Sequence, residues 1–294
     1  MKRKMPLMLK KSLPAYAFLL PWLLMFTVFT LIPFLIGIFY SFFDYDFVMM
    51  KFVGLGNYGA LFQDPAFLRS LLNTFLIALI VVTLTICVSL VLSVWIVNQS
   101  KSFQAISKIA LYIPAVSSSV AIVAIWRWIF GPACGISAMI CAKLGVSAID
   151  WFGQPLNAFS LVCLMVLTFS LGQPIVLYTA AIDSVPKTYY EAAELDGASK
   201  VRQFFSVTLP MIAPTTLYIL ITSTIAMMQV FEVPMLLTSG GPQNTTTTLL
   251  LLLYKTAFEY GRFGLAAAMG VVLFLIIGVI AIFQFRTANS DIQY

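Results

Sequence analysis

The chain has 294 residues, of which 61% are hydrophobic and 10% are charged, and it contains no histidine. Soluble domains carry about 25% charged residues, so the composition excludes an ordinary soluble fold. The lack of histidine also removes the most common general base and metal ligand at neutral pH. The formal net charge is +6, and the placement of the basic residues is more informative than their total.

The hydrophobic residues form long blocks, as membrane-spanning helices of about 20 residues require. A basic segment, residues 1–15, precedes the first block, which is too long and ends in residues too bulky for a cleavable signal peptide. We therefore expect an all-α integral membrane protein. It would have six transmembrane helices, over residues 16–40, 71–97, 106–130, 157–182, 213–237 and 263–285. Pro114 is expected to break the third span.

The basic residues predict the orientation of these spans. An even number of spans places both ends of the chain on one side, and basic residues favour the cytoplasm. With the N-terminus inside, most of the 17 Lys and Arg residues are cytoplasmic. These residues are Lys2, Arg3, Lys4, Lys10, Lys11, Lys101, Lys108, Lys187, Lys200, Arg202 and Arg286. We therefore expect both termini, and the connection between spans four and five, to be cytoplasmic.

That connection is the longest polar interruption in the C-terminal half. Helix-forming residues occupy 189–195, Gly197 interrupts them, and an amphipathic run leads to Leu209 and Pro210. The pattern predicts a helix, a sharp turn and a second helix that stops at the proline. Such an elbow is either a tight connection or a surface on which a cytoplasmic partner acts.

No catalytic motif stands out in the sequence. It contains no G-x-x-x-x-G-K-[ST] phosphate loop, H-E-x-x-H or G-x-S-x-G, so intrinsic nucleotide hydrolysis is disfavoured. Energy for driven transport would come from a partner or an ion gradient. Ion-coupled carriers place ionisable residues inside the membrane, whereas these spans are almost uncharged, with Glu232 the main exception.

A few polar residues interrupt spans four and five. Gln229 and Glu232 are three residues apart, which predicts a shared helix face that also includes Thr222. Gln173 precedes a proline, which frees a backbone carbonyl. These residues either make hydrogen bonds between helices or line a path for a hydroxyl-rich solute. The candidate substrate pathway is Trp126, Gln173, Tyr178, Thr222, Gln229 and Glu232.

Two further features leave alternatives open. Trp126 is either an anchor at the membrane interface or a sugar-stacking residue. Cys134 and Cys141 flank a short outer stretch and could form a disulfide, although nothing else in the sequence indicates a disulfide-stabilised fold.

The elbow resembles a known signature. Glu191-Ala192-Ala193, Asp196-Gly197-Ala198, Phe204, Leu209-Pro210 and Pro214 look like the EAA signature of type I ABC importer permeases. The resemblance implies that residues 183–212 form the coupling loop, seated in a cleft of a cytoplasmic ATPase subunit. The implied coupling residues are Glu191, Ala192, Ala193, Asp196, Gly197, Phe204 and Pro210.

Three other stretches are similar to the carbohydrate branch of that family, which includes the maltose and glycerol-3-phosphate systems. They are residues 33–45, residues 54–58 with Asn73-Thr74, and residues 237–242 with Tyr254, Ala257-Phe258 and Tyr260-Gly261. The resemblance implies a five-helix transmembrane domain over residues 67–285. The chain has only six predicted spans, so we expect it to lack the extra N-terminal spans and the large outer domain of some relatives.

The resemblance also implies the partners of the chain. They are a second homologous permease, two ATPase subunits that bind ATP and Mg²⁺, and an extracytoplasmic protein that delivers a sugar or oligosaccharide. The chain itself would lie in a bacterial-type inner membrane and have no catalytic residue, metal, cofactor or nucleic-acid partner. The alternatives are an ABC importer permease for another solute, an ion-coupled carrier, and a scaffold that transports nothing.

Overall fold

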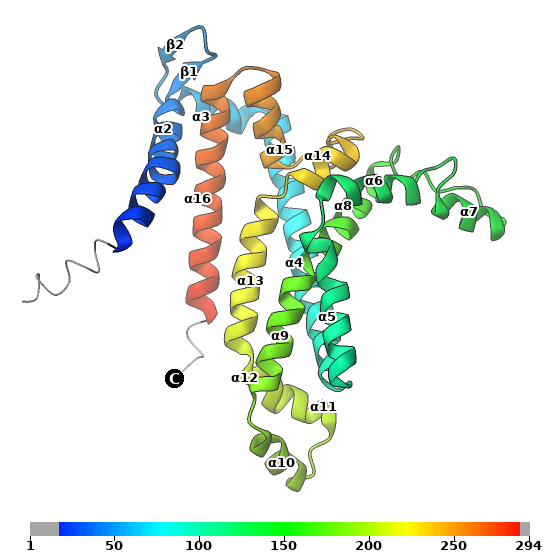
Figure 1. Cartoon of the computed structure of the whole chain (residues 1–294). Coiled ribbons are helices and arrows are strands. Elements are labelled where there is room, and N and C mark those ends of the chain that lie inside the picture. The colour runs from blue at the N-terminus through cyan, green and yellow to red at the C-terminus, as the bar shows by residue number, and fades with distance from the viewer. Residues whose placement is uncertain (1–17, 289–294) are drawn as a thin grey trace, which may run out of the picture. The chain divides into compact units, whose positions relative to one another are not determined.

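The computed structural model describes residues 18–288, and the basic segment 1–15 lies outside them. Their contacts divide the chain into two compact units, one of residues up to 63 together with 253–272, the other of 64–252 together with the residues from 273. Both are built mainly from helices (Figure 1). Among residues 18–288, three helices are long and apolar enough to cross a membrane, and three bent pairs raise the number to as many as six.

The first predicted span is a helix over Phe18–Tyr40. It contains a π-helical turn, η1 (Thr27–Leu31), followed by α2 (Ile32–Tyr40). Pro33 has no N–H to donate to the carbonyl four residues earlier, and the wider turn lies where that bond is missing. The described residues of predicted span one therefore form a helix that is long and apolar enough to cross a membrane.

A small β-hairpin follows, which the prediction of an all-helical chain did not include. Strands β1 (Phe43–Tyr45) and β2 (Met50–Phe52) pair antiparallel, and α3 (Gly56–Gln63) comes next. The buried Asn57 side chain holds the hairpin base by donating to the carbonyls of Ser41 (2.9 Å) and Phe43 (2.8 Å).

The remainder of this unit comes from the C-terminal region. It includes η3 (Lys255–Glu259) and the start of α16 (Phe263–Ala288), which corresponds to span six. A side chain at Gly264 would overlap the carbonyl of Phe43, so the glycine lets α16 approach the hairpin.

The second unit is organised around α4 (Pro65–Val97), the second span. The helix begins earlier than the predicted residue 71, because Asp64 caps it by accepting from the N–H of Ala66 and Pro65 supplies a preset first turn. One face of α4 carries small, fully buried hydroxyl residues, and Ser93 donates to the carbonyl of Ile175 at 3.2 Å. Small side chains allow neighbouring helices to pack closely in membranes.

The third span is two helices, α5 (Lys101–Val116) and α6 (Ser119–Ile129), which meet at 98°. The predicted break near Pro114 is therefore confirmed, and the two helices together cover most of the expected span over 106–130. The break lies at Ser117 and Ser118, whose extended backbone follows the turn that Pro114 weakens. A short helix, α7 (Ile136–Lys143), continues outward from α6 (Figure 1).

The fourth span is also bent, by 46°, between α8 (Pro155–Ser170) and α9 (Gly172–Ser184). Pro174 cannot donate to the carbonyl of Ser170, which accounts for a bend at this place. A Cβ at Gly172 would lie 2.9 Å from Cα of Tyr112, so this glycine sets the close approach of α9 to α5.

The fifth span ends earlier than predicted. Helix α13 (Ala213–Met228) stops before Gln229, and a separate helix, α14 (Glu232–Thr238), follows. Pro234 has no N–H for the carbonyl of Val230, which instead accepts a hydrogen bond of 2.8 Å from the hydroxyl of Thr248. The chain then reaches α15 (Leu249–Tyr254).

Candidate functional site

The elbow between α9 and α13 consists of two helical arms and lies at one end of the helix bundle (Figure 1). The first arm is α10 (Lys187–Leu195), and Gly197 after it has φ +73°. The N–H of Ala198 donates to the carbonyl of Ala193 at 2.9 Å, and that of Gly197 to Glu194 at 3.0 Å. This pair of bonds is a Schellman motif, which closes a helix and favours glycine. The predicted sharp turn is therefore confirmed.

The second arm runs through α11 (Lys200–Gln203), η2 (Phe204–Thr208) and α12 (Leu209–Met211). The arm does not stop at Pro210, as the sequence led us to expect. Proline instead lies after a π-helical turn that includes Ser206, the residue whose carbonyl Pro210 cannot bond. The chain bends later, by 67° between Met211 and Ala213.

The two arms are fastened to each other and to the bundle. The hydroxyls of Tyr190 and Thr208 are 2.9 Å apart and share a hydrogen bond. Where the arms join α9 and α13, the buried side chains of Tyr178, Val185 and Ile212 pack in one hydrophobic cluster. A displacement of the elbow therefore reaches the ends of α9 and α13 directly.

The predicted coupling residues lie on the outer part of this elbow. Glu191, Ala192, Asp196 and Gly197 are exposed, as is Pro210, whereas Ala193 and Phe204 are half-buried. Beside them Leu195 is 91% exposed. Single exposed apolar side chains are common on protein surfaces, so this exposure shows only that the Leu195 side chain is accessible to a partner.

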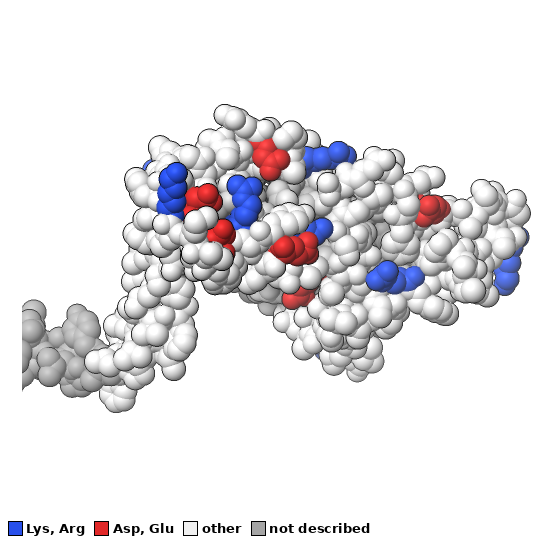
Figure 2. Space-filling view, turned by 90° about the horizontal axis from the view of Figure 1, so that it is seen from above, with Lys and Arg blue, Asp and Glu red and all other residues white. Residues whose placement is uncertain are grey.

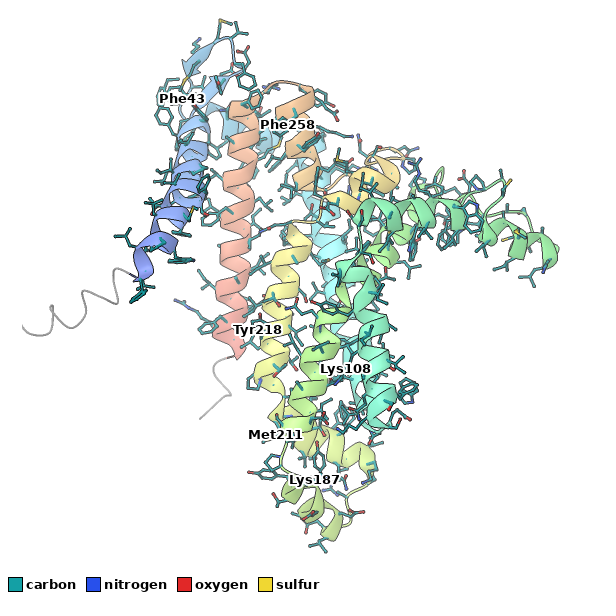
Figure 3. All side chains as sticks on the ribbon, in the orientation of Figure 1. Phe43, Lys108, Lys187, Met211, Tyr218 and Phe258 are labelled. Carbon is teal, nitrogen blue, oxygen red and sulfur yellow. The ribbon has the colours of Figure 1, made fainter. Side chains whose placement is uncertain are left out.

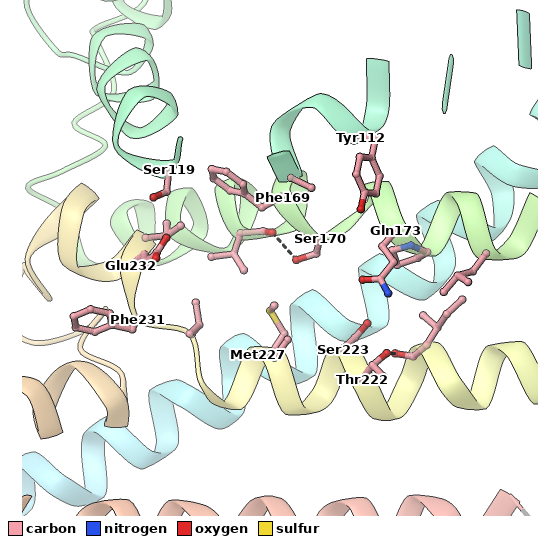
Figure 4. Close-up of a pocket in the computed structure, with 18 residues that line it drawn as sticks. Tyr112, Ser119, Phe169, Ser170, Gln173, Thr222, Ser223, Met227, Phe231 and Glu232 are labelled. Carbon is pink, nitrogen blue, oxygen red and sulfur yellow. Dashed lines mark hydrogen bonds between the residues drawn. The ribbon is translucent and has the colours of Figure 1, made fainter. Parts of the chain in front are cut away.

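A cavity of about 480 Å³ lies among α5, α6, α8, α9, α13 and α14. Volumes of 300–1,000 Å³ are usual for small-molecule sites, which makes the cavity a candidate binding site. Its walls are mainly apolar, and the polar groups converge from several helices (Figure 4). These groups belong to Tyr112, Ser119, Ser170, Gln173, Thr222, Ser223 and Glu232. Glu232 is the only charged residue among those that line the cavity.

The polar groups of the cavity differ in their availability. The hydroxyls of Ser170 and Thr222 donate to carbonyls of their own helices, at 2.7 Å and 2.8 Å. Within residues 18–288, the side chains of Gln173, Ser223 and Glu232 have no hydrogen-bond partner. In Figure 4 the Gln173 amide extends toward Thr222 and Ser223. An amide that can both donate and accept suits a ligand bearing hydroxyl groups.

Three residues of the predicted pathway do not line this cavity. Gln229 lies where α13 has ended, so it does not share a helix face with Glu232, and its side chain is exposed. Tyr178 is fully buried in the hydrophobic cluster where the elbow joins the bundle. Trp126 stacks on Phe130, with ring centroids 5.3 Å apart.

The predicted pathway did not include four polar residues of the cavity, which are Tyr112, Ser119, Ser170 and Ser223. Tyr112 and Ser119 lie on either side of the bend in span three, and both line the cavity. Ser223 directly follows the predicted Thr222, and its position relative to the other polar residues of span five did not indicate a shared helix face. Cys134 and Cys141 are both free, so the conceivable disulfide is absent.

Comparisons with known proteins agree with these features. Residues 89–290 match the family described as binding-protein-dependent transport system inner membrane component. The arabinooligosaccharides transport system permease protein AraP of Bacillus subtilis (strain 168) is 34% identical, and the match covers 96% of this chain and 90% of AraP. The lactose transport system permease protein LacF of Rhizobium radiobacter is 30% identical, with 94% of each chain covered.

A solved structure shows the same fold. It is a crystal structure of a bacterial ABC transporter involved in the import of the acidic polysaccharide alginate. The TM-score is 0.87 at 23% identity, and the match covers 97% of this chain and 98% of the other.

Proposed function

Because the chain belongs to the family of binding-protein-dependent transport system inner membrane components and is a sugar-type ABC permease, we propose that it carries a sugar or oligosaccharide through the cavity of the second unit. The observation that supports this cargo is the group of unpaired polar side chains in that cavity, with Gln173 at its centre. Hydroxyl groups of a sugar would exchange hydrogen bonds with water for bonds with these side chains.

The elbow supplies the second half of the proposal. An ATPase subunit contacts the exposed residues around Glu191 and Leu195, and its closure moves the two arms. Because the arms are joined through Tyr190 and Thr208, the movement is transmitted to α9 and α13, which both line the cavity. Glu191 is exposed and available for a charge-assisted contact with a basic group of that partner.

The remaining partners follow from the same proposal. A second permease completes the membrane path, and two ATPase subunits bind ATP and Mg²⁺ and hydrolyse the ATP. An extracytoplasmic protein delivers the sugar on the other side. Figure 2 shows acidic and basic side chains on one face of the molecule. The elbow also carries both signs of charge, so the proposal of a cytoplasmic elbow and cytoplasmic termini rests on the distribution of lysine and arginine along the sequence.

The cargo proposal is tested by two matched substitutions. Gln173→Ala removes an unpaired amide from the cavity, whereas Gln229→Ala removes the same group from an exposed position outside it. We expect Gln173→Ala to reduce uptake of the transported sugar by roughly 2- to 10-fold, the equivalent of one hydrogen bond. Gln229→Ala should leave uptake unchanged.

The measurement is uptake of labelled sugars into vesicles that contain the assembled importer, with and without internal ATP. Equal loss in both variants, or no loss in either, would argue against the cavity as the sugar path. Uptake driven by an ion gradient without ATP would favour the ion-coupled carrier instead. If only a non-sugar solute enters, the family assignment stands and the cargo proposal is wrong.

A further inference from the structure

A second cavity, of about 590 Å³, lies behind the elbow and is separate from the proposed sugar path. We call it the elbow cavity. It is formed where the end of α4, the end of α9, α10 and the second arm of the elbow meet. Because its walls come from both arms and from two spans, a molecule bound there would contact the elbow and the bundle together.

The charge of the elbow cavity is positive. Lys187 and Lys200 line it, against a single carboxylate, Asp183. Lys187 starts α10 within the elbow (Figure 3). Throughout residues 18–288, neither lysine has a carboxylate within salt-bridge distance, and the one polar contact of Lys200 is to the amide oxygen of Gln203 at 3.5 Å. Two ammonium groups that form no ion pair outnumber the single carboxylate of the cavity, which favours an anionic ligand.

The other residues that line the elbow cavity indicate which class of anion it would bind. Gln203 lines the cavity although its side chain is only 4% exposed, and Asn98 and Tyr190 add polar groups. Val97 and Phe204 form apolar walls. Lysine binds phosphate as a point charge, and basic pockets at the cytoplasmic ends of membrane helices accept phosphate head groups.

We propose that the elbow cavity binds a phosphate ester, held by Lys187 and Lys200 and with its organic part against the apolar wall. The ester has two possible sources, the head group of an anionic phospholipid such as phosphatidylglycerol and a soluble compound such as glycerol 3-phosphate. A bound ester joins α4 and α9 to both arms of the elbow, so its occupancy favours one elbow position over others.

The test compares two lysine pairs in the full chain, purified in detergent with its partner subunits and without nucleotide. The double variant Lys187→Gln and Lys200→Gln removes both charges of the cavity. The control, Lys101→Gln and Lys108→Gln, removes two charges predicted to lie on the same side, from positions that do not line the elbow cavity. Lys187→Arg with Lys200→Arg keeps the charge, and all variants must elute as the intact complex.

Two binding measurements separate the sources. Native mass spectrometry measures retention of phosphatidylglycerol against phosphatidylcholine, and equilibrium dialysis measures binding of glycerol 3-phosphate against glycerol. We expect the Gln pair to weaken one of the two interactions at least 10-fold, while the control pair and the Arg pair retain it. If the Gln pair loses binding of phosphatidylglycerol, the cavity is a lipid site. If it loses binding of glycerol 3-phosphate, the cavity is a site for a soluble ester.

Phosphate binding by the ATPase subunits is the same in every variant, so it does not affect the comparison. The proposal is overturned if the parent protein prefers neither phosphatidylglycerol over phosphatidylcholine nor glycerol 3-phosphate over glycerol. It is also overturned if the Gln pair binds the ester as tightly as the parent does, or if the control pair loses as much affinity as the Gln pair. Neither measurement requires transport, so the result is independent of the cargo proposal.

Discussion

At the scale of single residues, prolines determine where the spans deviate from regular helices. Each proline leaves the carbonyl four residues earlier without its helical partner, and an unpaired carbonyl is costly in a membrane. The chain resolves this in different ways. A π-helical turn precedes Pro33 and Pro210, a bend precedes Pro174, and a hydroxyl from another segment serves the carbonyl freed by Pro234.

The last solution makes Thr248 a structural residue. Thr248→Val keeps the shape of the side chain but leaves the carbonyl of Val230 without its 2.8 Å partner. We expect a loss of about 1–2 kcal/mol in the free energy of unfolding, seen as a lower midpoint of thermal unfolding in detergent. Thr83→Val is the control, because its hydroxyl is bonded only within its own helix. Equal midpoints for the two variants would refute the role of Thr248.

Asp46 gives a second prediction at this scale. Its carboxylate accepts from the N–H groups of Met49 (2.8 Å) and Val48 (3.1 Å) at the tip of the hairpin, and these bonds lower the pKa of Asp46 below its usual value. A lowered folded pKa means that the bonds support the turn above the ordinary aspartate pKa of about 3.9 and are lost as the pH falls through the folded value.

We therefore expect the amide chemical shifts of Val48 and Met49 to move on acidification below pH of about 4, toward values of a disordered loop. Asp46→Asn supplies a side-chain oxygen that does not titrate, so the same amides should stay constant over this range. Equal titration in both proteins would assign the change to another group.

At the scale of elements, the elbow depends on the conformation of one glycine. Gly197 has φ +73°, and no atom lies within 4 Å of the position that a Cβ would occupy, so a side chain there affects the backbone and not the packing. Valine in the left-handed region costs about 1–2 kcal/mol, whereas asparagine tolerates it.

Gly197→Val should therefore impair the coupling of ATP hydrolysis to sugar uptake, and Gly197→Asn, of similar size, should preserve it. The measurement is ATPase activity of the reconstituted importer with and without its binding protein. If both variants retain full stimulation, the Schellman turn is not needed for coupling. If both lose it, the defect comes from the added side chain and not from the backbone.

The sequence predicts the spans and the break near Pro114, but not the interruption of span five, and the reason is physical. Crossing a bilayer requires a long apolar run, which is visible in composition alone. The interruption of span five is accompanied by a bond between Val230 and Thr248, and the close approach of Gly172 to Tyr112 depends on how α9 packs against α5. Such contacts arise from tertiary structure, so the shared face predicted for Gln229 and Glu232 was wrong.

At the scale of the whole molecule, the proposed mechanism requires one orientation. An ATPase reaches the elbow only from the cytoplasm, while the segment between α6 and α7 lies at the other end of the same helix bundle (Figure 1). Cys134 belongs to that segment and is exposed, and Ser199 is exposed in the elbow. These two positions therefore report the two sides of the membrane.

Labelling with a membrane-impermeant maleimide tests the orientation, in a background where all other cysteines are replaced. In intact cells or protoplasts, Cys134 should be labelled, whereas Ser199→Cys should react only after the membrane is permeabilised. The reverse pattern would place the elbow outside, out of reach of any nucleotide-driven partner, and would overturn the coupling role. Labelling of both positions in intact cells would show that the basic residues do not fix a single orientation.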